Sequence, residues 1–297
     1  MKPPPFAYHA PRTLGEAIDA LAAAGADGKV LAGGQSLIPL LNMRLAAPGH
    51  LVDINRVAEL DTVSADETGV RVGALARHRR VERSAAAARG QPLLGQALRY
   101  VAHPAIRNRG TVVGSLAHAD PAAELPAVLS VLGGSVQTAS AAGRRTIPAA
   151  EFFAGPLESA LRPGELAVSA FFPVLRPRAG TAFAEFARRH GDYGLAGVAA
   201  LVALDDDLRV VTARVGCLGV ADTPLVLDLA AALGHRPPDS CDWAAAAAQA
   251  KAAVRPAADI HASADYRRHL VGVLTARTLR TAAANALDHH GEDERWQ

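Results

Sequence analysis

The chain has only two cysteines, Cys217 and Cys241, among its 297 residues. Two thiolates cannot hold an iron–sulfur cluster or a zinc site built from cysteine, so a redox centre carried by this chain must be organic. Long apolar runs are missing too, since the longest, "GLAGVAALVAL" at residues 194–204, is much too short to span a bilayer. The first residues, "MKPPPFAYHAPR", lack the apolar segment of a secretory signal. These absences predict a cytoplasmic location.

A charge excess of either sign is also absent. Lys plus Arg total 31 against 29 for Asp plus Glu, and the formal net charge is +2. A nucleic-acid-binding chain would need clustered basic residues, so this class is disfavoured. Half of the residues are hydrophobic and a fifth are charged, which is typical of a globular protein. The length suffices for two or three domains, each with its own core.

Hydrophobic periodicity predicts alternating helices and strands in the first part of the chain. Thr13 and Glu16 have the spacing of a capping box at the start of the first helix. The order strand, tight turn, helix, strand between residues 29 and 54 predicts a compact βαβ unit. Helices are expected at residues 13–24, 36–45, 77–88, 92–102 and 121–132, and strands at 29–32, 50–54, 70–74, 135–139, 144–148 and 165–172.

The later part of the chain begins after a predicted linker, "FFPVLRPRAG" at residues 171–180, which contains two prolines and a glycine. The polar end "DHHGEDERWQ" is expected to fray. Between them, three strands are expected at residues 181–187, 196–204 and 208–219, and three helices near 224–233, 241–252 and 264–284.

The first candidate site is "AGGQS" at residues 32–36, between a predicted strand and a predicted helix. Adjacent glycines let the backbone turn sharply and bring its N–H groups close to a ligand. A helix N-terminus after such a turn adds a partial positive charge. The stretch matches neither the Rossmann nor the P-loop fingerprint. A pyrophosphate-binding turn and a plain strand-to-helix connection therefore both remain open.

A second small-residue turn occurs in "RGTVVGSLAHADPAAELP" at residues 109–126. Two such turns from different segments can clamp one long ligand from two sides. The Glu124 carboxylate can accept hydrogen bonds from ribityl or ribose hydroxyls. For Asp120, followed by Pro121, the favoured interpretation is the N-cap of the next helix.

A third stretch, "RRHGDYGLAG" at residues 188–197, predicts a tight turn that presents Tyr193. An aromatic side chain at such a loop tip can lie against a flavin ring. The alternative is an ordinary amphipathic tyrosine between two strands.

Four stretches, taken together, carry a family resemblance. They are "AGGQSLIPLLNMRLAAPGHLVDINRVAEL", "HPAIRNRGTVVGSLAHADPAAELPAVL", "RRHGDYGLAGVAA" and "DIHASADYRRHLVGVLTART". In this order and spacing they resemble the FAD-binding medium subunit of the molybdenum hydroxylases. That group includes aerobic carbon monoxide dehydrogenase and bacterial xanthine, nicotine-derivative and quinoline dehydrogenases. The resemblance extends from about Pro5 to Ala284.

The resemblance implies an α+β fold in three parts. Two α+β subdomains of the vanillyl-alcohol-oxidase type clamp FAD, and a C-terminal flavoprotein domain with a three-stranded antiparallel sheet and helices follows. The implied boundaries are an N-terminal FAD-binding subdomain at 1–58, a middle one at 59–176, the C-terminal domain at 177–285 and a polar tail at 286–297.

The resemblance also implies which residues contact the cofactor. It implies no catalytic residue and no metal ligand in this chain. Leu166 is expected near the adenine and Tyr193 beside the isoalloxazine ring. The pyrophosphate is expected at Ala32, Gly33, Gly34, Gln35, Ser36, Thr111, Gly114 and Ser115, with further cofactor contacts at Leu37, Val101 and Glu124.

One residue departs from the family pattern. Relatives usually read T-[IV]-G-G-S in the second turn, and Val113 replaces the first glycine of that pair. If this position needs a positive φ, a β-branched residue is strained there. If its φ is negative, the valine only narrows the approach to the ligand.

The resemblance implies an electron-transfer subunit. Such a chain takes electrons from a small [2Fe–2S] subunit into FAD and passes them to an external acceptor. A large molybdopterin subunit oxidises the substrate, and the heterotrimer pairs into a dimer. One alternative is a flavin-free docking or assembly subunit, in which Val113 prevents FAD binding. A free-standing flavin oxidase or reductase is disfavoured because no acid–base constellation is present. The motifs are marginally closer to subunits of N-heterocycle and aldehyde hydroxylases.

Overall fold

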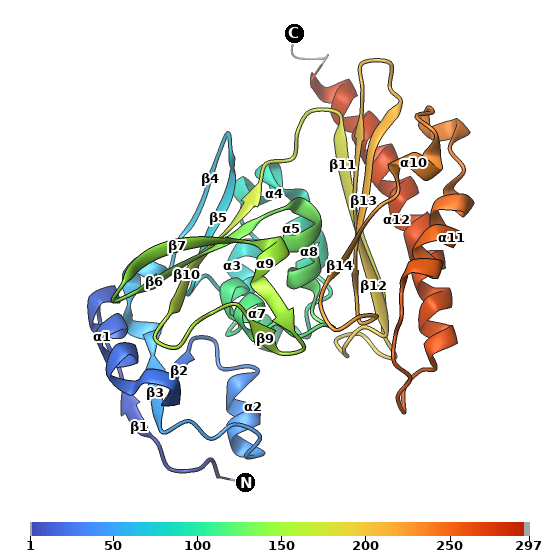
Figure 1. The fold of residues 1–297 in the computed structure, drawn as a ribbon. Coiled ribbons are helices and arrows are strands. Elements are labelled where there is room, and N and C mark those ends of the chain that lie inside the picture. Colours follow the sequence, from blue (N-terminus) through green and yellow to red (C-terminus); the bar gives the residue numbers. More distant parts are fainter. Residues whose placement is uncertain (1, 294–297) are drawn as a thin grey trace.

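The computed structural model describes residues 2–293, in which three larger sheets follow one another along the chain and a short hairpin is inserted before the last strand of the second (Figure 1). The first sheet is parallel, and the second and third are antiparallel. This mixed arrangement confirms the predicted α+β class. Within the described residues, no helix is long and apolar enough to cross a membrane.

The first sheet has the order β1-β3-β2, with β1 Ala7–His9, β2 Gly28–Leu31 and β3 His50–Asp53. Helix α1 (Leu14–Ala24) precedes β2, and α2 (Leu37–Asn42) connects β2 to the parallel strand β3. The predicted βαβ unit is thus confirmed. Strand β1 was not predicted, because three half-exposed residues show no usable periodicity.

Helix α1 begins at the predicted cap. The Thr13 hydroxyl accepts a hydrogen bond from the Glu16 N–H at 3.2 Å. The Glu16 carboxylate reaches back one residue further than a capping box requires and accepts from the Arg12 N–H at 2.7 Å. The helix start is therefore held from both directions, as the spacing predicts.

The second sheet has the order β4-β5-β10-β6-β7. Its strands are β4 Val63–Asp66, β5 Gly69–Gly73, β6 Ser135–Ser140, β7 Gly143–Pro148 and β10 Leu166–Pro173. Its helices are α3 His78–Glu82, α4 Ala85–Gly90, α5 Pro92–Leu98, α6 Pro104–Arg107, α7 Val112–His118, α8 Glu124–Leu132 and α9 Ala149–Phe152. The hairpin is β8 Phe153–Gly155 with β9 Glu158–Ser159.

Several predicted boundaries in this part were wrong. The helix expected at 77–88 is two helices, because the Ser84 hydroxyl accepts from the Ala87 N–H and starts α4. Strand β4 and helices α6 and α7 were not predicted. The linker expected at 171–180 is shorter, since β10 runs to Pro173 and β11 begins at Ala179.

The third sheet has four strands in the order β11-β12-β13-β14, not the three that were predicted. They are β11 Ala179–Phe186, β12 Ala196–Leu204, β13 Val210–Leu218 and β14 Leu225–Asp228. Strand β14 lies inside a segment predicted as helix, because a short apolar run fits either period until a partner strand pairs with it. Here β13 supplies that partner, with Val215 opposite Leu227.

The chain ends in helices α10 (Ala230–Leu233), α11 (Trp243–Ala253) and α12 (Ala264–Asp293). Helix α12 continues through the predicted boundary at residue 285, so residues 286–293 of the expected tail are helical, and 294–297 lie outside the described residues. Ala282, Ala283 and Ala286 on α12 are buried, which explains why the helix extends.

Two hydrophobic cores hold these layers together. One joins the first and second sheets, and the other lies between the third sheet and helices α11 and α12. Helix α8 packs on the other face of the third sheet (Figure 1), where a Cβ on Gly216 would lie 2.7 Å from the Ala127 carbonyl oxygen. The third sheet is therefore anchored directly to the second unit, which is the second sheet together with helices α3 to α9.

Candidate functional site

A cavity of about 650 Å³ is lined by residues from the first sheet, the second unit and the turn before β12. Every site residue predicted from the sequence lines it. These are Ala32, Gly33, Gly34, Gln35, Ser36, Leu37, Val101, Thr111, Gly114, Ser115, Glu124, Leu166 and Tyr193. Segments far apart in sequence thus meet as predicted, and contact with a cofactor stays a prediction for each residue.

The first glycine turn is built for close approach. Gly34 has a φ of +74°, which favours glycine. A Cβ on Gly33 would lie 2.5 Å from the carbonyl oxygen of Arg109 and 2.7 Å from Cα of Gly110. Because both are backbone atoms of the second turn, the two predicted turns touch each other, and only glycine permits this contact at residue 33.

The second turn is the start of helix α7. Thr111 is its N-cap, and its hydroxyl accepts from the Gly114 N–H at 3.1 Å. A Cβ on Gly114 would lie 2.6 Å from that hydroxyl oxygen, so glycine leaves room for the cap.

Val113 lies inside helix α7, and it is not among the residues with positive φ. Its side chain is 2% exposed and joins the core beside Val112 and Leu116. The valine therefore fits the helical backbone without strain. Of the two possibilities left open by the sequence, the structure has the one without a positive φ, and Val113 lines the cavity.

Glu124 is the first residue of α8, at the cavity wall, and burial raises its pKa to about 7. Asp120 is not the N-cap of this helix, contrary to prediction, since Ala123 occupies that position. The Asp120 carboxylate instead accepts from the Ala122 N–H at 2.9 Å. The helix therefore begins at Glu124 and not at Pro121.

A second carboxyl group near Glu124 was missed. Glu185 on β11 has a buried Oε2 atom without a hydrogen-bond partner among the described residues. Burial raises its pKa to about 8, and the neighbouring Glu124 contributes in the same direction. A lone glutamate in a strand carries no sequence signal for this, because its surroundings come from other elements.

His78 also lines the cavity and was not predicted. It is 5% exposed, and its ring lies next to the Thr111 backbone, with no well-formed hydrogen bond to either nitrogen from residues 2–293. Burial lowers its pKa to about 4, so the imidazole is neutral at physiological pH. In the sequence, "RHRR" at residues 77–80 suggests an exposed basic helix, which hides this buried position.

One end of the cavity carries Tyr193, which is 68% exposed. The turn before it has Gly191 at a φ of +88°, and a Cβ there would lie 2.5 Å from the His103 ring. The predicted tight turn is confirmed, and glycine lets it pass directly over this histidine.

The other wall consists largely of residues 157–167, of which only Leu166 was predicted as a site residue. Within it, Arg162-Pro163-Gly164-Glu165 forms a turn in which the Glu165 N–H donates to the Arg162 carbonyl at 3.0 Å and Gly164 has a φ of +79°. Proline followed by glycine is the signature of a type II turn, so the signal was present in the sequence. In Figure 1 this loop, between β9 and β10, lies toward α1, and the turn before β12 lies on the opposite side of α7.

Comparison with known families gives two matches in tandem. Residues 4–175 match the FAD binding domain in molybdopterin dehydrogenase, and residues 181–282 match the CO dehydrogenase flavoprotein C-terminal domain. The 6-hydroxypseudooxynicotine dehydrogenase complex subunit alpha of Paenarthrobacter nicotinovorans is 42% identical over 96% of this chain and 97% of that one.

Solved structures agree with these matches. A chain of quinoline 2-oxidoreductase from Pseudomonas putida 86 superposes with a TM-score of 0.89 at 38% identity, covering 97% of this chain and 100% of that one. A chain of carbon monoxide dehydrogenase from Hydrogenophaga pseudoflava gives 0.89 at 35% identity, with 96% and 99% covered.

Proposed function

The chain belongs to the family of the FAD-binding domain in molybdopterin dehydrogenase, and on this premise we propose that it is the FAD-carrying electron-transfer subunit of a heterotrimeric molybdenum hydroxylase. It takes electrons from a small [2Fe–2S] subunit and passes them to an external acceptor, while a large molybdopterin subunit oxidises the substrate. The assembly is a cytoplasmic dimer of heterotrimers. The observation that carries the proposal is the contact between the two glycine turns at one wall of a single cavity.

The residues present fit FAD. A volume of about 650 Å³ lies within the usual range of ligand pockets, roughly 300–1,000 Å³. The two turns offer small side chains and backbone N–H groups, which suit a pyrophosphate. Lys29 lines the same cavity and adds a positive charge. Relatives named as a complex subunit and as medium chains support a multi-subunit assembly.

The arrangement of the walls supports one direction for the dinucleotide. The glycine turns would hold the pyrophosphate at Gly33, Gly34 and Thr111, and Tyr193 would lie beside the isoalloxazine ring. The adenosine half would then extend toward α1 and the 157–167 loop, because this loop lies on the other side of α7 from the turn before β12, the turn that carries Tyr193 (Figure 1).

Bound FAD would supply a redox centre that exchanges one or two electrons. The chain's own residues bind and orient it and tune its surroundings. With a pKa of about 7, the Glu124 carboxyl can hold or release a proton near neutral pH at the cavity wall. His78 stays neutral there, because burial keeps its pKa at about 4.

The test is the visible absorption spectrum of the full chain purified under mild conditions, followed by acid release and chromatographic identification of the chromophore. We expect FAD in equimolar amount with the wild-type chain, and the same amount with Val113→Gly. A colourless wild type that gains FAD only with Val113→Gly would instead support the flavin-free docking subunit. The helical backbone at Val113 favours the first outcome.

A further inference from the structure

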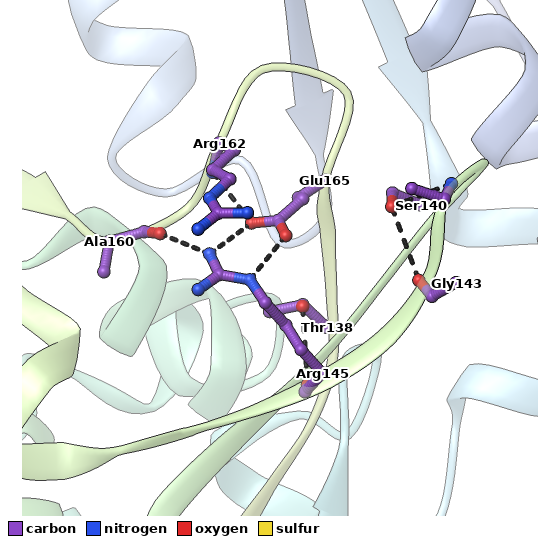
Figure 2. A network of polar contacts seen from close by, with 8 residues as sticks. Thr138, Ser140, Gly143, Arg145, Ala160, Arg162 and Glu165 are labelled. Carbon is purple, nitrogen blue, oxygen red and sulfur yellow. Dashed lines mark hydrogen bonds and ion pairs between the residues drawn. The ribbon is translucent and has the colours of Figure 1, made fainter.

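The turn at residues 162–165 is held by a single arginine from another strand. Figure 2 shows Arg145 of β7 reaching across to Glu165. The Arg145 Nε donates to Glu165 Oε1 at 2.6 Å, and Nη2 donates to Oε2 at 2.6 Å. Nη2 also donates to the Ala160 carbonyl at 2.6 Å. One guanidinium group therefore fixes both ends of the loop formed by residues 160–165.

The carboxylate of Glu165 is well satisfied. Besides the two bonds from Arg145, it accepts from the Arg162 N–H at 2.8 Å, and its side chain is 8% exposed. Hydrogen bonding from Arg145 accordingly lowers the pKa of Glu165 below its ordinary value. A bidentate, partly buried pair of this kind fixes geometry more firmly than an exposed ion pair.

The loop that this pair holds is a cavity wall. Leu161, Arg162, Pro163, Gly164, Glu165 and Leu166 all line the cavity, whereas Arg145 does not. On its far side the loop approaches helix α1, where a Cβ on Gly164 would lie 4.0 Å from Cα of Ala22. The loop therefore closes the cavity between the second sheet and the first, and Arg145 can influence a ligand only through Glu165 and the backbone.

We propose that Arg145 is a positioning residue that holds the 160–165 loop in the shape that receives the adenosine half of the cofactor, and so makes the site select FAD over FMN. The inference rests on the proposed function. Leu161 and Pro163 offer apolar surface to a purine, and Arg162 adds a cation. FMN ends at its first phosphate, so it would occupy the glycine turns and the Tyr193 end without reaching this loop.

The experiment compares FAD and FMN binding to the deflavinated full chain by fluorescence titration. The variants are Arg145→Met, which removes the guanidinium group, and Glu165→Gln, which keeps the shape of the acceptor side chain. Arg144→Met is the matched control, because Arg144 is the exposed neighbour on the same strand. We expect FAD affinity to fall on the order of tenfold in Arg145→Met, with FMN affinity unchanged within about twofold, because a disordered wall must be reordered on binding. Arg144→Met should bind both like wild type.

The outcomes separate this inference from the proposed function. Equal loss of FAD and FMN affinity in Arg145→Met, or no loss of either, would overturn the role of Arg145 while FAD binding by the wild type still supports the proposed function. A wild type that binds neither flavin would overturn both. Thermal unfolding checks that each variant is folded, and if Arg145→Met is not, the selective loss of FAD affinity must appear in Glu165→Gln.

Discussion

Two walls of the cavity are held in opposite ways. At the glycine turns, backbone meets backbone, and the contact exists because Gly33 has no side chain. At the 160–165 loop, the backbone is held in place by hydrogen bonds between the side chains of Arg145 and Glu165. The first wall is intolerant of any added atom, and the second depends on specific polar atoms being present. Adding a side chain should therefore disrupt the first wall, whereas removing a polar side chain should disrupt the second.

The largest effect on FAD binding is expected where the glycine wall is broken. In Gly33→Ala the new Cβ meets the Arg109 carbonyl and Gly110 Cα, and backbone atoms cannot move aside as a flexible side chain can. We expect the turns to separate, FAD binding to weaken by at least about tenfold and stability to fall by about 1–3 kcal/mol.

Flavin content and urea unfolding measure these effects. Gly95→Ala is the control, because a Cβ at Gly95 in α5 meets nothing within 4 Å. Unchanged FAD binding in Gly33→Ala would contradict the close contact of the two turns.

One more glycine at this wall should not improve FAD binding. Val113→Gly places glycine inside α7 and removes a side chain that is 2% exposed. Lost burial and helix propensity should lower the free energy of unfolding by about 2–4 kcal/mol without raising FAD affinity. Chemical denaturation and flavin titration measure both quantities. Tighter FAD binding in the variant would show that the valine obstructs the site.

The Glu185 carboxyl group, near Glu124, belongs to neither of these two walls. Burial gives Glu185 a pKa of about 8 in the folded chain, above its ordinary value of 4.5. Between these values the folded state binds more protons than the unfolded state, so the stability from this group is present at low pH and lost as pH rises toward 8.

Glu185→Gln has no proton to lose. Its free energy of unfolding should exceed that of the wild type by about 1–3 kcal/mol at pH 8 and converge with it near pH 4.5. Urea unfolding across this pH range measures the difference. The control is Glu151→Gln, at an exposed position in α9. Parallel curves for Glu185→Gln and the wild type would contradict the buried, unpartnered carboxyl.

The smallest effect should come from the cap that shapes the second turn. Thr111→Ala removes the hydroxyl that accepts from the Gly114 N–H, which should cost about 0.5–2 kcal/mol. Thr111→Ser keeps the hydroxyl and should lie close to the wild type. Thermal unfolding of the three proteins tests this order, and equal melting temperatures for the alanine and serine variants would show that the cap is dispensable.

Much of this organisation could be predicted because its causes are local. The Thr13 cap, the βαβ unit and strand β12 follow from periodicity and capping chemistry within a few residues. The site residues came from the family resemblance, and the cavity does gather them. Strand β14 was misassigned because its three apolar residues pair only once β13 lies beside them. Asp120 was misassigned because its turn with Ala122 competes with capping.

The sequence by itself determined where the backbone could turn tightly, since Gly34, Gly191 and the Pro163-Gly164 pair allow conformations that other residues resist. Only the tertiary structure decided which of these turns meet. The contact of Gly33 with Gly110, the burial of His78 and the reach of Arg145 to Glu165 each join segments distant along the chain. Such contacts depend on how sheets and helices pack, and the sequence near either partner carries no record of the other.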